Sequence, residues 1–172
     1  MDSRQILLSD QFVISCGTVT IDPQRSKVLL IRLRTTDEYF LPKGRKDIGE
    51  TLEETAKRET FEETGIQVEL LPLKINTLAT VPSAAIAANH TGAVTEPMAM
   101  TQRKDATGTL KIIFWFVAEG DSASVPEQRQ QQEGEDFDTV WKDFDDVAAT
   151  LSFDDDRRVA AAAIDAFQTT KS

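Results

Sequence analysis

Residues 44–66 read GRKDIGETLEETAKRETFEETGI, a glutamate-rich stretch with a glycine near each end. Glu59, Glu62 and Glu63 are three and four positions apart, so on a helix their carboxylates lie on one face. Three like charges on one face repel one another and destabilise a helix that leaves them unpaired. Mg²⁺ and Mn²⁺ prefer oxygen ligands, so the same spacing favours a divalent metal site. The alternative is a solvated acidic helix without a ligand.

Local signals predict a loop, a helix and a second loop across this stretch. Thr51 and Glu54 have the spacing of a capping box, so the helix is expected to begin at about Leu52. Gly65 stands where glycine commonly ends a helix. Residues 43–50 are expected to form a loop, because Gly44 and Gly49 can adopt backbone angles that other residues avoid.

The spacing of these residues resembles the Nudix box, the sequence motif of the Nudix hydrolases. That motif reads Gly, five residues, Glu, seven residues, Arg-Glu, an aliphatic residue, any residue, Glu-Glu, any residue, Gly and an aliphatic residue. The matching positions are Gly44, Glu50, Arg58, Glu59, Glu62, Glu63, Gly65 and Ile66. Thr60 departs from the motif at the first aliphatic position, and we expect Phe61 to supply the packing there.

The resemblance implies which residues carry the chemistry. The implied metal ligands are the carboxylates of Glu59, Glu62 and Glu63 and the backbone carbonyl of Gly44, and the implied cofactor is Mg²⁺ or Mn²⁺. Arg58 is expected to orient the carboxylates. Glu50 is expected to bridge to Arg58, with direct metal contact as the lesser alternative.

The same resemblance implies hydrolysis of a P–O–P bond, which requires a base for the attacking water. Glu63 is our first choice, because it can hold a metal and still face that water. The alternatives are Glu133, Glu135 and Asp136, which precede the last expected strand. His90 is the only histidine, so the sequence offers no pair of histidines for acid–base chemistry.

The residues that lead into the box suggest the substrate. Pro42-Lys43-Gly44 resembles the same position in the diphosphoinositol polyphosphate and diadenosine polyphosphate hydrolases of this family. The expected substrate-binding cations are Lys43, Arg45, Lys46, Arg32 and Arg34, with Arg103, Lys104 and Lys111 as further candidates. The departure is residues 45–48, which read Arg-Lys-Asp-Ile where those subfamilies differ. We favour a diphosphoinositol polyphosphate, and a diadenosine polyphosphate comes next.

Two other functions stay open. A nucleotide-sugar or ADP-ribose pyrophosphatase would need aromatic residues for stacking, and Tyr39, Phe40 and Trp115 are available for this. A non-catalytic Nudix binding module typically loses carboxylates of the box, and all of them are present here.

Composition narrows the class of protein. The chain has 172 residues, which suits a single domain over residues 1–172, and a net charge of −10, which argues against general nucleic-acid binding. No apolar run is long enough for a membrane span. Cys16 is the only cysteine, so nothing requires an oxidising compartment. We expect a cytoplasmic protein, with the nucleus as an alternative and secretion only if a signal peptide has been removed. The oligomeric state is left open.

Apolar periodicity predicts the remaining elements. We expect a hairpin, a central apolar strand, a last strand and two C-terminal helices. This order agrees with the fold that the resemblance implies, an α/β fold of the Nudix type, an α/β/α sandwich around a mixed sheet. The expected strands are 11–20, 27–34, 38–41, one long or two short strands within 66–81, 109–118 and 138–143; the helices are 145–151 and 154–168, and residues 82–108 form a long loop.

Overall fold

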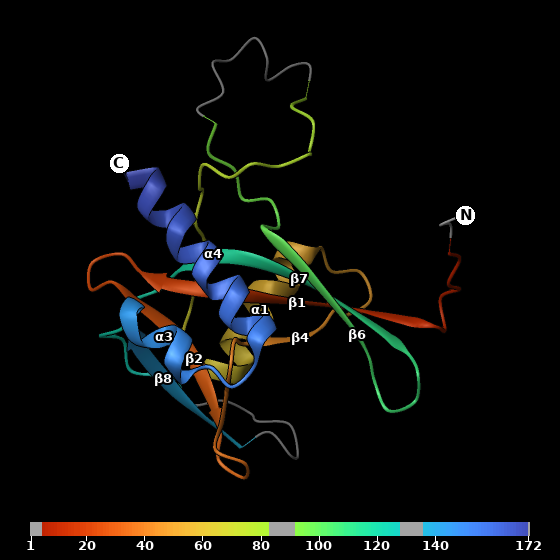
Figure 1. Cartoon of the computed structure of the whole chain (residues 1–172), viewed down its shortest axis with the longest axis horizontal. Helices are drawn as coiled ribbons and strands as arrows, with labels where there is room; N and C mark the ends of the chain where they lie inside the picture. The colour runs from red at the N-terminus through yellow and green to blue at the C-terminus, as the bar shows by residue number, and fades with distance from the viewer. Residues whose placement is uncertain (1–4, 83–91, 128–135, 172) are drawn as a thin grey trace.

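The computed structural model describes residues 5–82, 92–127 and 136–171. It contains a mixed sheet with helix α1 on one face and helices α3 and α4 on the other (Figure 1). This is the expected α/β/α sandwich. No helix in the described part of the chain is both long enough and apolar enough to cross a membrane.

The centre of the sheet is a parallel pair of strands. Strand β1 (Phe12–Asp22) runs beside β7 (Leu110–Glu119), in register from Phe12 opposite Leu110 to Ile21 opposite Glu119. Strand β1 is buried over most of its length and β7 over half of it, as expected for strands covered on both faces. The expectation that residues 109–118 form a central strand is confirmed.

The other strands are antiparallel to their neighbours and extend the sheet on both sides. Strand β2 (Lys27–Leu33) meets β1 only at the hairpin end, where Ile21 faces Val28, and continues between β8 (Phe137–Asp143) and β3 (Glu38–Phe40). The first half of β1 is therefore free to pair with β4 (Lys43–Arg45). On the other side, β6 (Ala99–Lys104) and β5 (Glu69–Leu70) pair with β7.

Strand alternation divides the core into two faces. Val19 and Trp115 point towards α3 (Phe144–Thr150) and α4 (Asp154–Lys171), where they form the larger apolar cluster with residues such as Val159. Cys16 and Phe116 point the other way and pack against Ala56 of α1 (Leu52–Thr64). Cys16 is a buried core residue, and burial raises the pKa of its thiol to about 12.

Helix α1 begins and ends where the sequence predicts. The capping box is complete, because Thr51 accepts a hydrogen bond from Glu54 N while the Glu54 carboxylate accepts one from Thr51 N. Gly65 ends the helix with a φ of 70°, in the left-handed region that favours glycine, and its N–H donates to Phe61 O.

The packing of α1 corrects our expectation for Phe61. Thr60 itself is fully buried, and Phe61 is only partly buried. The Thr60 hydroxyl donates to Ala56 O and lies 2.7 Å from the hydroxyl of Thr18, which lies 2.7 Å from that of Thr20. A hydroxyl fits where the motif has an aliphatic residue because β1 supplies the matching polar partners.

Three expected segments differ in the structure. Residues 43–50 are not entirely a loop, since β4 fills the unpaired edge of β1. Residues 82–108 contain β6, an edge strand. Most of its residues are exposed and polar, so its sequence lacks the alternation of apolar and polar residues that predicts a strand. Within 66–81 only the short β5 and an isolated bridge between Leu73 and Val94 form.

Replacing Thr60 by valine tests the hydroxyl chain. The variant keeps the volume but removes one partner of the buried Thr18 hydroxyl, so the free energy of unfolding is expected to fall by about 1 kcal/mol. Thr150→Val is the matched control, because Thr150 also donates to the carbonyl four residues earlier, Asp146 O, but from an exposed site. Urea denaturation measures the free energy of unfolding of both variants. Equal losses of stability in the two would contradict the proposed role of the linked threonine hydroxyls.

Candidate active site

Strand β4 brings a glycine against the carboxylates of α1. Gly44 pairs with Cys16 of β1, and both residues face α1. A Cβ atom on Gly44 would lie 1.8 Å from Glu59 Oε2 and 2.1 Å from Glu59 Cδ. Only glycine therefore lets the Glu59 carboxylate pack against the backbone of β4, where the implied ligands Gly44 and Glu59 are neighbours.

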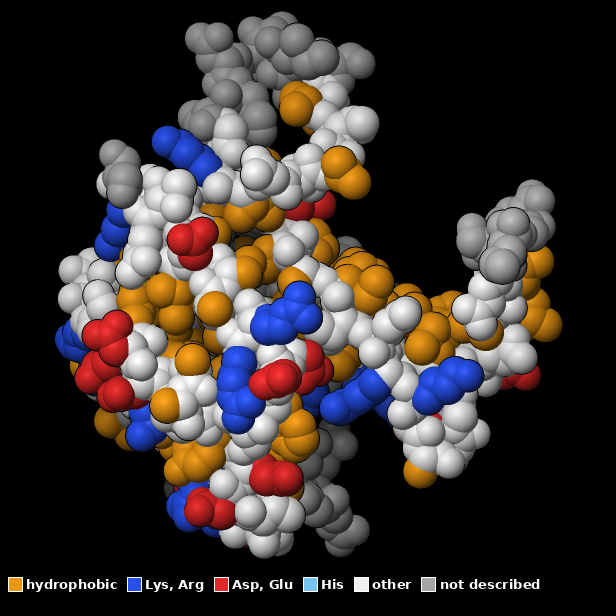
Figure 2. All heavy atoms as spheres, viewed as in Figure 1, with side chains coloured by type: hydrophobic (Ala, Val, Ile, Leu, Met, Phe, Trp, Pro, Cys, Tyr) orange, Lys and Arg blue, Asp and Glu red, His pale blue; other side chains and the backbone are white. Residues whose placement is uncertain are grey.

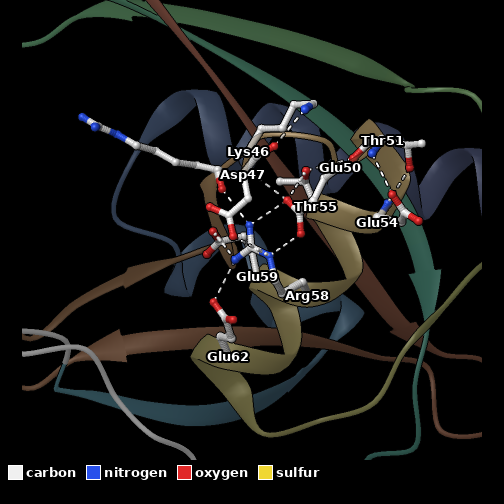
Figure 3. A network of polar contacts seen from close by, with 10 residues as sticks. Lys46, Asp47, Glu50, Thr51, Glu54, Thr55, Arg58, Glu59 and Glu62 are labelled. Carbon is white, nitrogen blue, oxygen red and sulfur yellow. Dashed lines mark hydrogen bonds and ion pairs between the residues drawn. The ribbon is translucent and has the colours of Figure 1, made fainter.

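Arg58 lies among the carboxylates of α1 and the loop before it (Figure 3). Its Nη1 donates to Glu59 Oε1 at 2.8 Å and to Glu62 Oε2 at 2.9 Å, and its Nε donates to Glu50 Oε1 at 2.6 Å. Nη2 reaches the backbone carbonyl of Arg45 at 2.8 Å. The Glu50 hydrogen bond is the largest cause that raises the pKa of Arg58. One guanidinium thus offsets the repulsion among these acids.

Glu50 occupies the bridging position that the sequence suggested. Besides Arg58, it accepts hydrogen bonds from Asp47 N at 2.9 Å and from the Thr55 hydroxyl at 2.9 Å. The hydrogen bond from Arg58 is the largest influence that lowers its pKa, from 4.5 to about 2. Thr55 was not identified from the sequence, because a buried threonine in a helix gives no signal of this contact.

Glu63 connects the last turn of α1 to β4 from a buried position. Its side chain is only 6% exposed, and Oε2 accepts a hydrogen bond from Lys43 N at 2.8 Å. Glu59 and Glu63 therefore reach the two neighbouring residues of β4, Gly44 and Lys43, while Glu62 is more exposed at 41%. The carboxylates of Glu59 and Glu63 therefore lie along strand β4.

The oxygen donors at this edge suit a hard divalent cation. Glu59, Glu62 and Glu63 supply carboxylates, and the absence of a side chain at Gly44 lets one of them approach the backbone. Among the described residues, no three acids, histidines or cysteines stand close enough together to enclose an ion. Glu59 and Glu62 both point towards the guanidinium of Arg58, while Glu63 is held by the N–H of Lys43.

The predicted substrate-binding cations fall into two groups. Lys43 and Arg45 flank Gly44 on β4 and so point to the opposite face of the sheet, and the Lys46 ammonium donates to Asp47 O. Arg32 and Arg34 belong elsewhere, in ion pairs at the junction of β2 and β8. Their partners are Asp37 and Asp138 for Arg32, and Asp136 and Asp138 for Arg34.

The structure also describes one of the alternative bases, Asp136, and the aromatic residues Trp115 and Phe40. Asp136 pairs with Arg34 at 2.6 Å, while Glu133, Glu135 and His90 lie outside the described residues. Trp115 is fully buried and donates to the Thr101 hydroxyl. Phe40 is partly buried and stacks on Phe153 at 5.2 Å between ring centroids, with the Lys43 ammonium 5.5 Å from the Phe40 centroid.

Asp156 of α4 is a contributor that the sequence did not reveal. Three aspartates, Asp154 to Asp156, stand in the first turn of α4, where the helix dipole favours negative charge. Asp156 instead is 5% exposed, and its Oδ2 accepts a hydrogen bond from Leu41 N at 3.1 Å. Burial raises the pKa of this carboxyl. The contact fixes the chain just before Pro42 and Lys43.

Comparison with known proteins identifies the class. The sequence profile of the NUDIX domain matches residues 12–163, so this chain belongs to the NUDIX family. The fold is similar to a NUDIX-family hydrolase from Clostridium perfringens, with 18% identity over 92% of this chain and 98% of that one and a TM-score of 0.62. A NUDIX hydrolase from Nitrosomonas europaea gives 17% identity, 88% and 87% coverage and a TM-score of 0.59.

A third similar structure carries a more specific description. It is a C. elegans Ap4A hydrolase, solved as a binary complex, with 16% identity over 91% of this chain and 98% of that one and a TM-score of 0.60. At these identities the structural similarity shows the fold, and the matched NUDIX profile shows the family. Members of this family generally use divalent metal cations.

Replacing Gly44 by alanine tests the contact between β4 and Glu59. The new methyl group would displace the Glu59 carboxylate, so we expect Mn²⁺ affinity to fall by about tenfold or more. The side chain of Glu59 can move, so the loss of stability should be small. Gly49→Ala is the control, because nothing lies within 4 Å of its Cβ position and only its φ of 90° opposes the change. Calorimetric Mn²⁺ titrations that gave equal affinities for both variants would contradict the role of Gly44.

Replacing Glu50 by glutamine tests the Arg58 network through acid stability. The folded-state pKa of Glu50 is lowered, so its contribution is present above pH 4.5 and is lost as the pH falls towards about 2. Glu50→Gln is expected to lower the free energy of unfolding at pH 7 by about 2 kcal/mol, the loss of a charge-assisted hydrogen bond. The difference from the wild type should shrink between pH 4.5 and 2. Denaturation in EDTA across this range measures it, and a constant difference would argue against the assignment.

Proposed function

We propose that this protein is a metal-dependent pyrophosphohydrolase that cleaves a P–O–P bond in a polyphosphorylated small molecule. The observation that supports this most is the arrangement at β4. Gly44 admits the Glu59 carboxylate on one side, the Lys43 N–H holds Glu63, and the flanking Lys43 and Arg45 present positive charge on the other. The acidic side chains that would bind a metal ion and the basic side chains that would bind a phosphate thus lie on opposite sides of one strand.

The chain's own residues have distinct roles in this proposal. Glu59, Glu62 and Glu63, with the carbonyl of Gly44, would hold Mg²⁺ or Mn²⁺, and Arg58 orients Glu59 and Glu62 through its Nη1. A bound divalent ion supplies charge neutralisation for the phosphates and acidifies water. Glu63 is the proposed base for the attacking water, because its buried carboxylate is fixed by Lys43 N.

The favoured substrate is a diphosphoinositol polyphosphate. Such a molecule carries many phosphates and no base, and so calls for distributed positive charge more than for an aromatic slot. Lys43, Arg45 and Lys46 provide charge beside the carboxylates, while the guanidinium groups of Arg32 and Arg34 are already engaged by aspartates. We therefore leave Arg32 and Arg34 out of the proposed substrate site.

A diadenosine polyphosphate is the second candidate, and one observation favours it. Phe153, which is 38% exposed, stacks on Phe40 beside the Lys43 ammonium. An exposed aromatic next to a cation could accept an adenine ring while the cation meets the phosphate chain. The likeness to the C. elegans Ap4A hydrolase is consistent with this alternative.

Loss of the carboxylates should abolish metal-dependent turnover. Glu62→Gln and Glu63→Gln each remove a charged ligand while keeping a hydrogen-bond acceptor, so kcat/KM is expected to fall by about 100-fold or more with Mg²⁺. Glu53→Gln is the matched control on the exposed first turn of α1. Phosphate release with and without EDTA, together with circular dichroism, measures activity and folding. Full activity in EDTA would rule out the proposed reaction.

A side-by-side assay tests the substrate class. A diphosphoinositol polyphosphate should be cleaved to release orthophosphate with a kcat/KM about tenfold or more above that of ADP-ribose or a sugar nucleotide, because more phosphates meet the cations. Phe153→Ala separates the second candidate, since it should lower turnover of diadenosine tetraphosphate only. A preference for ADP-ribose would contradict the inositol assignment.

A further inference from the structure

Four basic side chains meet on the face of the sheet opposite α1. The register places Lys43 beside Gly17 and Arg45 beside Ser15, and it places Arg103 of β6 directly opposite Lys111 of β7. Strand alternation puts all four on the side that carries Trp115 and α4. Figure 2 shows this side of the molecule, with Lys and Arg side chains over the region where β4 and β6 lie in Figure 1.

No ion pair in the described part of the chain explains this cluster as a structural feature. Within residues 5–82, 92–127 and 136–171, none of the four cations forms an ion pair. Directly opposed like charges on neighbouring strands are destabilising. Burial, followed by the positive charges of Lys43, Arg103 and Arg45, lowers the pKa of Lys111 to about 8. Three acids interact electrostatically with this cluster: Glu63 with Lys111, the buried Asp156 with Lys43 and Arg103, and Asp105 with Arg45.

A buried serine at the same place provides an independent observation. Ser15 is 0% exposed, and its Oγ has no hydrogen-bond partner among the described residues. Its neighbours in register are Arg45 on β4 and Ile113 on β7, so its side chain shares the face of the four cations. Leaving a buried hydroxyl unpaired costs about 1–3 kcal/mol. An anion bound between the cations would give it an acceptor.

We infer that Lys111, Arg103 and Ser15, with Lys43 and Arg45 as its wall, form a subsite for a non-reacting phosphate group of the substrate. The subsite deepens the proposed function, because the carboxylates of α1 lie beyond β4, on the far side of the same short strand. It selects substrates with phosphates well beyond the bond that is cleaved. Lys43 connects the two regions, since its N–H holds Glu63 and its side chain faces the cations.

Binding without turnover tests this subsite. The probe is inositol hexakisphosphate, which has no P–O–P bond, titrated calorimetrically into the full chain in EDTA. We expect Lys111→Met and Arg103→Gln to raise the Kd by about 5–10-fold each, as charge-assisted contacts to a phosphate are lost. Lys104→Gln is the matched control, because Lys104 is the next residue on β6 and points to the other face; its Kd should stay within about twofold.

Ser15→Ala separates a ligand contact from a structural role. Because the hydroxyl has no partner in the protein, the variant should keep or raise the melting temperature while weakening probe binding by about threefold or more. The subsite is wrong if Lys111→Met binds as the wild type does, or if Lys104→Gln loses as much affinity as Arg103→Gln. Unchanged affinity in Ser15→Ala would overturn the assignment of that residue. If the protein binds the probe but hydrolyses no diphosphate, the subsite is supported and the proposed reaction is wrong.

Discussion

The contact of one guanidinium with several carboxylates is the interaction on which this site depends. Without Arg58, Glu50, Glu59 and Glu62 would place neighbouring negative charges at the edge of β4 without the guanidinium that offsets their repulsion. Arg58 also binds the carbonyl of Arg45, so the same side chain that neutralises the helix joins it to the strand. The guanidinium thereby lowers the cost in stability of placing Glu50, Glu59 and Glu62 near one another.

The second constraint is the short strand that Arg58 secures. Successive residues of a strand point to opposite faces of the sheet. In β4, Gly44 faces helix α1, and Lys43 and Arg45 point away from it. The acidic side chains of α1 and the basic side chains of β4 therefore lie on opposite sides of the strand and do not neutralise one another. Asp156 supports this arrangement from the opposite layer by holding Leu41 N, so both layers of the sandwich determine where β4 lies.

The sequence predicted what depends on local spacing and missed what depends on partners distant in the chain. The limits of α1, its capping box and the bridge between Glu50 and Arg58 all follow from short intervals. β4 and β6 did not, because Lys-Gly-Arg has no apolar pattern and β6 is exposed; each exists because a neighbouring strand has a free edge. Thr60, Asp156 and Ser15 were missed for a similar reason, since their environment comes from residues far along the chain.

The parallel ladder between β1 and β7 has a consequence for how the protein reaches this state. It joins segments roughly a hundred positions apart, and such non-local pairing is slow to form compared with a helix or a hairpin. During synthesis, α1 emerges well before the strand that completes the sheet beneath it. The acidic helix can form early, but the surface that orients it and the cations on β6 and β7 assemble only after most of the chain has been made. Competence to bind ligand should therefore appear late in folding, after the secondary structure of the helix is already in place.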